Sequence, residues 1–373
     1  MKTFQRSLSN LDEIHSIELN FRPNLLLCFV SPQFKEIDDA LSLLKDKFPE
    51  AMIAGCSTSG EILDVSVYDQ SIALTAIEFE KTEIRLITED IEDPEHSHQA
   101  GLSIAKKLSG DKLKHIMIFS DGLHVNGAEL VRGLRSGVSD KTSVTGGLAG
   151  DGSDFAHTFV ISNGNISEKK IIGIGFYSDD LKIGCGSKGG WDSFGLERRV
   201  TKARSNVLYE IDGQPALALY KTYLGDKAAE LPSSGLLFPL SMRDQERELP
   251  VVRTILAVNE EDQSLTFAGD IPEGSYVRLM KANINRIIDG AQASAQLCNG
   301  KGAGSSLAVL ISCVGRRLVL KQLVEEEIEA VRGVLGEQPS ITGFYSYGEI
   351  APFEGFSPCQ LHNQTMTITT FSE

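Results

Sequence analysis

Two segments near opposite ends of this chain share one pattern, and that repeat constrains the fold more than any other feature of the sequence. Segments 53–62 and 341–350 carry isoleucine, glycine, glycine, glutamate and isoleucine at the same spacing. Each segment follows a cysteine-bearing apolar run, at 26–30 and 309–314, and a helix-like stretch. Self-similarity of this kind predicts a duplicated strand–helix–strand unit.

A third, fainter copy runs from the apolar stretch 115–119 through 127–135 to 144–151, which ends in glycine-rich sequence. The two clearer copies are followed by Gln-Ser at Gln70 and by Gln-Thr at Gln364. Glycine after a strand permits a tight turn where a side chain would clash. The repeats therefore predict similar turns at the ends of similar strands.

Short hydrophobic strands alternate with amphipathic helices over most of the chain, which favours a layered α/β architecture, α/β to α+β in class. We expect two packed domains, residues 20–223 and 224–370, because no obvious linker separates them. The expected strands are 24–30, 51–55, 71–79, 83–88, 115–119, 143–147, 158–162, 171–177, 251–258, 265–268, 276–280, 307–313, 341–344 and 364–371. The expected helices are 34–47, 97–108, 127–135, 215–223, 283–297 and 318–334.

The repeated turns allow two interpretations. In the first, their glycines and acidic residues only shape the turns. In the second, the repeats are related by pseudo-symmetry, so that Glu61, Asp151 and Glu349 face one shared crevice, where open α/β sheets often bind ligands. Both interpretations can hold together.

Charge and hydropathy exclude several classes of protein. The chain has 36 basic and 51 acidic residues, a formal net charge of -15 and no strong basic cluster, so nucleic acid is not an expected partner. No stretch of about 18 apolar residues and no secretion signal is visible, which predicts a cytoplasmic protein without a membrane span. The six cysteines lack CxxC spacing, so we expect buried reduced thiols.

Several motifs resemble the FIST family when taken in order. The segments 54–61 (AGCSTSGE), 120–123 (SDGL) and 146–152 (GGLAGDG) look like its N-terminal domain. The segments 312–317 (SCVGRR), 343–350 (GFYSYGEI) and 361–367 (LHNQTMT) resemble its C-terminal companion. Each motif alone is weak because glycine-rich turns are common, but together they cover roughly residues 20 to 370.

The resemblance implies a sensory role in signal transduction. FIST domains occur fused to histidine kinases, cyclic-dinucleotide enzymes and chemoreceptors, and are proposed to bind small ligands such as amino acids. Since this sequence shows no output domain, we expect a separate partner, a histidine kinase of a two-component system or a cyclic-di-GMP enzyme. One branch of the family binds haem and senses nitric oxide, and this is the favoured specific form.

A haem needs an axial donor, usually His or Cys, in an apolar pocket. The candidates are His124, which follows Asp121-Gly-Leu, His157, which follows the glycine-rich turn, and His362, which belongs to the closing motif. Cys313 and Cys359 are less favoured. Only one of these residues is expected to bind the iron, and for each of them a structural role is the alternative.

Receptors for amino acids or other small metabolites form the main alternative to haem. A ligand carboxylate requires a guanidinium or backbone N–H groups, and a ligand ammonium requires a carboxylate. The candidate ligand-binding residues, drawn from the repeated turns and the C-terminal motifs, are Gly60, Glu61, Gly147, Asp151, Arg316, Gly348, Glu349 and Asn363. A scaffolding protein whose repeats only build an interface is the third alternative, and self-association as a homodimer stays open.

Catalysis is not expected. Cys56 and Ser57 follow a strand, but the sequence has no G-x-S-x-G motif and no identifiable His and Asp partners. The glycine runs match neither a P-loop nor a dinucleotide-binding motif. The histidines and carboxylates show no H-E-x-x-H or similar spacing, so a metal-dependent hydrolase is not indicated either.

Overall fold

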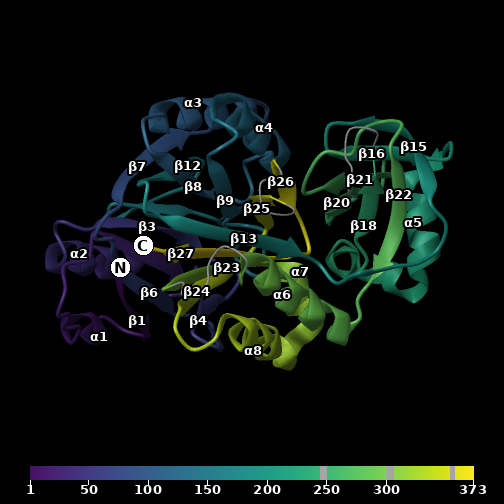
Figure 1. Ribbon diagram of the computed structural model, residues 1–373. Helices are drawn as coiled ribbons and strands as arrows, with labels where there is room; N and C mark the ends of the chain where they lie inside the picture. Colours follow the sequence, from purple (N-terminus) through teal and green to yellow (C-terminus); the bar gives the residue numbers. More distant parts are fainter. Residues whose placement is uncertain (244–249, 300–305, 353–357) are drawn as a thin grey trace.

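A computed structural model describes residues 1–243, 250–299, 306–352 and 358–373 (Figure 1). It confirms a mixed α/β protein whose two parts pack together. The larger part lies on the left of Figure 1 and contains three six-stranded sheets, and the smaller part on the right is formed by one nine-stranded sheet and helix α5 (Ala216–Leu224).

The larger part contains three copies of one unit, which correspond to the two clear sequence repeats and the fainter third one. The first copy consists of β1 (Lys2–Leu8), α1 (Asp12–His15), β2 (Leu25–Val30), α2 (Ile37–Lys47), β3 (Met52–Ser57), β4 (Glu61–Leu63), β5 (Ser66–Tyr68) and β6 (Ile72–Glu78). The second consists of β7 (Glu83–Asp90), η1 (Pro94–His96), α3 (Ser97–Leu108), β8 (Leu113–Ser120), α4 (Gly127–Gly137), β9 (Ser143–Leu148), β10 (Val160–Ser162), β11 (Asn165–Ser167) and β12 (Lys170–Tyr177). The fainter sequence repeat is therefore a full structural repeat.

The third copy is interrupted by the smaller part. It begins with β13 (Lys182–Lys188) and resumes with α6 (Ile284–Asn299), β23 (Leu307–Cys313), α7 (Val314–Leu320), η4 (Lys321–Leu323), α8 (Val324–Leu335), β24 (Ser340–Ser346), β25 (Gly348–Pro352), β26 (Cys359–His362) and β27 (Met366–Ser372). In every copy a central strand, β2, β8 or β23, pairs in parallel with the next strand, β3, β9 or β24.

Short hairpins exchange between the copies and lock the three sheets together. The hairpin β4–β5 pairs with β24 of the third copy, β10–β11 pairs with β3 of the first, and β25–β26 pairs with β9 of the second. The sheet orders are β1-β6-β2-β3-β10-β11, β7-β12-β8-β9-β25-β26 and β13-β27-β23-β24-β4-β5. This cyclic exchange gives the larger part, hereafter the core, an approximate threefold symmetry.

One glycine recurs at the same register position in all three copies. Gly55 pairs with Cys28, Gly146 with Ile118 and Gly343 with Leu310. A Cβ atom at these glycines would lie 1.8, 2.0 and 1.8 Å from the carbonyl oxygen of the paired residue. At this one position the two parallel strands lie too close together for any side chain, which explains the glycine in the sequence repeat.

The central strands pack their buried side chains against one another where the three sheets meet. Phe29 of β2 and Phe119 of β8 lie 5.5 Å apart between ring centroids, and both contact Phe344 of β24. Ile311 of β23 belongs to the same cluster. These residues come from all three copies, so the copies share one hydrophobic cluster.

The smaller part, hereafter the inserted domain, spans β14 to β22. Its elements are β14 (Asp192–Ser193), β15 (Arg198–Arg204), β16 (Val207–Ile211), β17 (Gln214–Pro215), α5, η2 (Gly225–Glu230), η3 (Ser233–Leu237), β18 (Leu240–Arg243), β19 (Val251–Arg253), β20 (Ile255–Asn259), β21 (Ser264–Phe267) and β22 (Tyr276–Lys281). The expected boundary at residues 223 and 224 falls inside this domain, at the end of α5. Because the chain leaves the core after β13 and returns before α6, the spatial units are not consecutive in sequence.

Candidate functional site

The turns after β3, β9 and β24 lie beside one another where the three copies meet. The N–H of Ser59 donates to the Tyr345 carbonyl at 2.8 Å, and the N–H of Gly150 donates to the Ser57 carbonyl at 3.0 Å. The N–H of Tyr347 donates to the Leu148 carbonyl at 3.2 Å. Each turn therefore hydrogen-bonds to its neighbour, and the turns fill the axis instead of leaving it open.

Glu61 and Glu349 occupy equivalent positions and make equivalent bonds. The Thr58 hydroxyl donates to Oε1 of Glu61, and the Ser71 hydroxyl donates to Oε2 at 2.8 Å. In the other copy Ser346 donates to Oε1 of Glu349 at 2.6 Å, and Thr365 donates to Oε2 at 2.9 Å.

Both glutamate side chains are buried, and their environments perturb their ionisation. Burial raises the pKa of Glu61 to about 7 and that of Glu349 to about 8, although the hydrogen bonds from the neighbouring hydroxyls act in the opposite direction. Each carboxyl group links the first strand of an exchanged hairpin, β4 or β25, to the residue just before the next core strand, β6 or β27. The turn-shaping interpretation thus has direct support for this pair, and their role towards a ligand stays a prediction.

The three candidate glycines lie within the same packed turns. Gly60 has φ +132°, which favours glycine, and a Cβ there would meet the Arg317 guanidinium at 2.7 Å. A Cβ at Gly147 would lie 2.7 Å from the Ile311 side chain, and one at Gly348 would lie 3.0 Å from Leu148. Tight packing thus accounts for glycine at all three positions.

Asp151 organises the loop between β9 and β10. Its carboxylate accepts hydrogen bonds from the N–H groups of Phe155 at 3.0 Å, Ala156 at 2.8 Å and His157 at 2.6 Å, and from the Tyr347 hydroxyl. The Phe155 ring stacks on Tyr347, with centroids 4.5 Å apart. We call residues 151–157 the Asp151 loop.

Arg316 is fully buried against Glu327 rather than facing an open site. Its Nη2 and Nε donate to Glu327 Oε2 at 2.6 and 3.1 Å, and Nη2 also donates to the Ile287 carbonyl at 2.8 Å. Nη1 donates to the Gly189 carbonyl. Gly189 follows β13 and Ile287 lies in the first turn of α6, so this guanidinium binds both chain segments that connect the inserted domain to the core.

Asn363 is buried beside the axis, and its amide nitrogen donates to the Tyr347 carbonyl at 3.4 Å. The neighbouring Gln364 donates to the Leu236 carbonyl at 3.0 Å and to the Thr254 hydroxyl at 3.1 Å, which joins the core to the inserted domain. The side-chain oxygens of both residues are buried without a hydrogen-bond partner among the described atoms. They offer acceptors near the domain junction.

The three candidate histidines lie in different environments. His124 is about one-third exposed, and its Nδ1 lies 3.2 Å from Asp121 Oδ1. His157 is exposed and its Nδ1 lies 2.8 Å from Glu168 Oε1. His362 is buried, with Nε2 2.9 Å from the Ala351 carbonyl. The structure does not bring these imidazoles together.

An apolar cavity of about 260 Å³ lies between the core and the inserted domain. Phe155 of the Asp151 loop and Leu318 of α7 line it from the core, and Leu236, Leu237 and Ile255 line it from the inserted domain. Its remaining described lining residues are Ser153, Glu230, Pro232, Ser233, Ser234 and Leu256. We call this space the junction cavity.

Sequence reasoning reached the Asp151 loop but missed the junction cavity. Phe155 lies three residues after the glycine-rich motif 146–152. Leu236 and Leu237 lie in a short 3-10 helix whose sequence matches none of the motifs. Only the contact between core and inserted domain makes these residues neighbours, so no sequence signal could have grouped them.

The described residues contain no group of three or more His, Cys, Asp or Glu side chains placed to hold a metal ion. Among the same residues, no helix is long and apolar enough to cross a membrane. All six cysteines are buried free thiols.

Comparison with known proteins identifies both halves of the chain. Residues 24–214 match the family described as the FIST N domain, and residues 216–352 match the FIST C domain. The chain is 28% identical over 205 residues to the uncharacterized protein MJ1623 of Methanocaldococcus jannaschii, a match that covers 50% of this chain and 38% of that protein. Thus the chain spans well under two thirds of that relative.

Among solved structures, PurLQS from Thermotoga maritima aligns with 85% of this chain and 74% of its own. The sequence identity is 9% and the TM-score 0.20, so this alignment carries no structural argument.

Proposed function

The chain belongs to the FIST family, whose domains serve sensory ligand binding in signal transduction, and we propose that it binds its small-molecule ligand in the junction cavity. The observation that carries this proposal is the position of the cavity: its walls come from the Asp151 loop and α7 on one side and from η3 and β20 on the other. A ligand there contacts both parts of the protein at once, as a sensor requires.

The lining indicates the chemistry of the ligand. Aliphatic and aromatic side chains dominate the wall, Glu230 supplies the one carboxylate and three serines supply hydroxyls among the described lining residues. Those residues include no lysine or arginine. The cavity therefore favours a small, mostly apolar metabolite with an amine or another hydrogen-bond donor over a simple anion.

The contacts between core and inserted domain suggest how binding produces a signal. Besides the Gln364 bonds, Arg253 donates to the Leu361 carbonyl at 3.1 Å, and Asn126 donates to Asp270 at 3.0 Å. Polar interfaces of this kind resemble those between mobile domains. We propose that the ligand shifts the docking of the inserted domain, and that a separate histidine kinase or cyclic-di-GMP enzyme reads the shift.

Haem-based nitric oxide sensing is a second proposal, and the observation that favours it is the pair His124–Asp121. A metal-ligating histidine commonly has its other ring nitrogen held by a carboxylate, as Nδ1 of His124 is here. However, no histidine is among the described residues that line the junction cavity, so the present arrangement does not fit a haem there. This form of the proposal requires a rearrangement that brings an imidazole to an apolar pocket.

A cytoplasmic location completes the proposal. Six buried free thiols with no disulfide fit a reducing compartment.

A thermal-shift screen of amino acids, amines and other small metabolites tests the main proposal. We expect a ligand that raises the melting temperature, because binding to the folded state alone stabilises it. In Leu237→Trp the larger side chain fills the cavity, and calorimetry should show at least tenfold weaker binding of that ligand. Leu219→Trp, at a half-buried leucine elsewhere on the inserted domain, is the matched control.

The outcomes separate the alternatives. Equal affinity in Leu237→Trp and the wild type would remove the ligand from the junction cavity. A Soret band after haem addition that shifts with nitric oxide and is lost in His124→Ala would establish the haem form instead. Tight partner binding that ignores every small molecule would favour a scaffold.

A further inference from the structure

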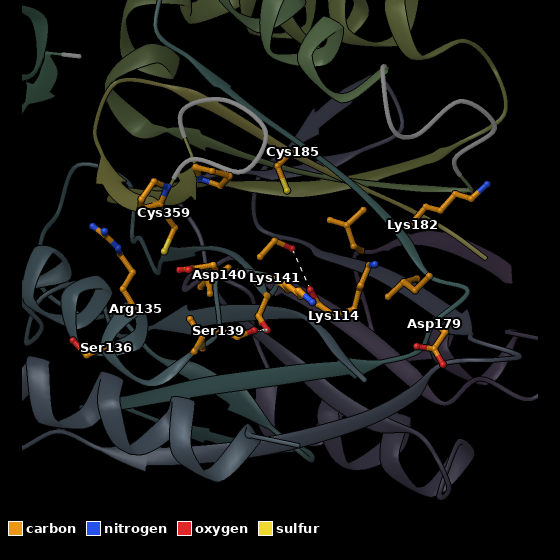
Figure 2. A pocket seen from close by; sticks show the side chains of 18 of the residues that line it. Lys114, Arg135, Ser136, Ser139, Asp140, Lys141, Asp179, Lys182, Cys185 and Cys359 are labelled. Carbon is orange, nitrogen blue, oxygen red and sulfur yellow. Dashed lines mark hydrogen bonds between the residues drawn. The ribbon is translucent and has the colours of Figure 1, made fainter. Parts of the chain in front are cut away.

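A second cavity, of about 1100 Å³, lies away from the junction cavity at the other end of the parallel strands. It is bordered by the starts of β8 and β9, the end of α4, the turn before β13, the end of β25 at Pro352 and the start of β26 at Cys359 (Figure 2). We propose that this cavity is a second ligand site, for a monomeric aliphatic molecule with an anionic head such as a fatty acid or an alkyl phosphate.

Four cationic side chains from different elements line the cavity: Lys114 on β8, Arg135 on α4, Lys141 before β9 and Lys182 on β13. Within the described part of the chain, none of the four forms an ion pair. In the view of Figure 2, Arg135 lies at one end near Cys359, Lys182 lies at the other, and Lys114 and Lys141 lie between them.

Acidic side chains around the cavity do not neutralise this charge. Asp179 pairs with Lys112 at 2.7 Å, and Asp180 pairs with Lys81 at 3.6 Å, both outside the lining. Arg132 also lines the cavity but is already paired with Glu129 and Asp270. Asp140 alone of the described lining carboxylates forms no ion pair in the described chain, so the unpaired charge of the described lining is positive in a protein whose net charge is -15. Such a local excess attracts an anion.

The rest of the described wall combines apolar side chains with the hydroxyl groups of Ser136, Ser139, Thr142 and Ser143. Val144, Leu181, Cys185 and Cys359 line the cavity and are buried, and Ile183 and Leu297 join them. An alkyl chain is stabilised on an apolar wall in proportion to the area that it buries there. An aliphatic body with an anionic head therefore suits the described lining.

Titration calorimetry with dodecyl phosphate below its micelle concentration tests this inference. We expect saturable binding that weakens with added salt. The double variant Lys114→Glu/Lys141→Glu should bind at least tenfold more weakly, because two favourable charges become unfavourable ones. The control Lys45→Glu/Lys106→Glu makes the same change in net charge at exposed lysines outside the cavity and should bind within about twofold of the wild type.

Two further probes separate charge from apolar contact. If the cationic side chains bind the anionic head group of the ligand, dodecylamine should not bind. If the apolar wall binds the alkyl chain of the ligand, inorganic phosphate should bind far more weakly than dodecyl phosphate. N-ethylmaleimide labelling of Cys185 and Cys359, read by mass spectrometry, should slow when dodecyl phosphate is bound.

Equal binding by the charge-reversal variant, or equal binding of dodecylamine, would overturn the inference. So would binding of the protein to phosphatidylglycerol vesicles without any binding of monomeric dodecyl phosphate, because that result would indicate a membrane surface. The junction cavity shares no lining residue with this one, so failure here leaves the proposed function standing.

Discussion

Replacement of Arg316 by methionine tests whether this buried guanidinium holds the inserted domain to the core. The side chain is fully buried, ion-paired to Glu327, and bonded to the Gly189 and Ile287 carbonyls. Methionine preserves much of the volume but leaves the Glu327 carboxylate without its counter-charge. Removing one partner of a buried ion pair costs about 3–5 kcal/mol.

We therefore expect Arg316→Met to lower the free energy of unfolding by about 4 kcal/mol. Urea denaturation followed by the fluorescence of Trp191 measures this loss at the relevant place, because Trp191 is the single tryptophan and lies just after Gly189. Its indole N–H donates to the Gln364 carbonyl at 2.9 Å across the same junction.

A double-mutant cycle isolates the ion pair. Glu327→Leu removes the carboxylate, and the double variant Arg316→Met/Glu327→Leu leaves no buried charge of the pair. We expect the double variant to be at least 2 kcal/mol more stable than the sum of the single effects predicts. A loss below about 1 kcal/mol in Arg316→Met, or strict additivity, would refute the reasoning.

Two further predictions concern the repeated units. The free energy of unfolding should fall as pH rises from about 4.5 to 8, because over this range the unfolded Glu349 carboxyl ionises while the folded one, with its raised pKa, keeps its proton. In Glu349→Gln the fall should be shallower by up to about 1.4 kcal/mol per pH unit, and an unchanged slope in urea titrations would contradict the raised pKa. Gly343→Ala should cost about 3 kcal/mol or more because its Cβ would lie 1.8 Å from the Leu310 carbonyl oxygen. Gly333→Ala on α8 meets nothing within 4 Å and should be neutral or stabilising, so similar urea midpoints for the two variants would argue against the close strand approach.

Long, strongly patterned elements could be predicted from the sequence. The expected helix at 97–108 and the expected strand at 307–313 coincide with α3 and β23. The expected helix at 318–334 is in fact divided between α7 and α8, with a 3-10 turn between them. That division allows Arg316 to reach Glu327 across the turn, a contact that helical spacing did not indicate.

The exchanged hairpins could not be predicted in the same way. Strands such as β4 (Glu61–Leu63) have three residues, too few for a hydrophobic period to emerge. Their partners lie in another copy of the unit, about 280 residues away for Ile62 and Gly343, so only the assembled core defines them. The sequence repeat did indicate that the turns bearing Glu61 and Glu349 are equivalent, although it did not show that hydroxyl groups saturate both carboxylates.

The inserted domain could not be predicted from the sequence for a related reason. The chain leaves the core after Lys188 and returns at Ile284 without a run of linker-like residues. A domain boundary predicted from composition divides the chain at one point. An inserted domain has two boundaries, and the two segments that flank it must lie close together in the core. Arg316 supplies that contact, and its partners are backbone carbonyls that no sequence pattern reveals.

Hydrogen–deuterium exchange of the wild type, with and without a saturating ligand from the thermal-shift screen, tests the central claim most directly. Binding in the junction cavity predicts slower exchange in peptides covering the Asp151 loop and η3, which line it on opposite sides. Protection confined to peptides 138–144 and 182–185, at the larger cavity, with none at the Asp151 loop and η3, would contradict the claim that the ligand binds between the core and the inserted domain.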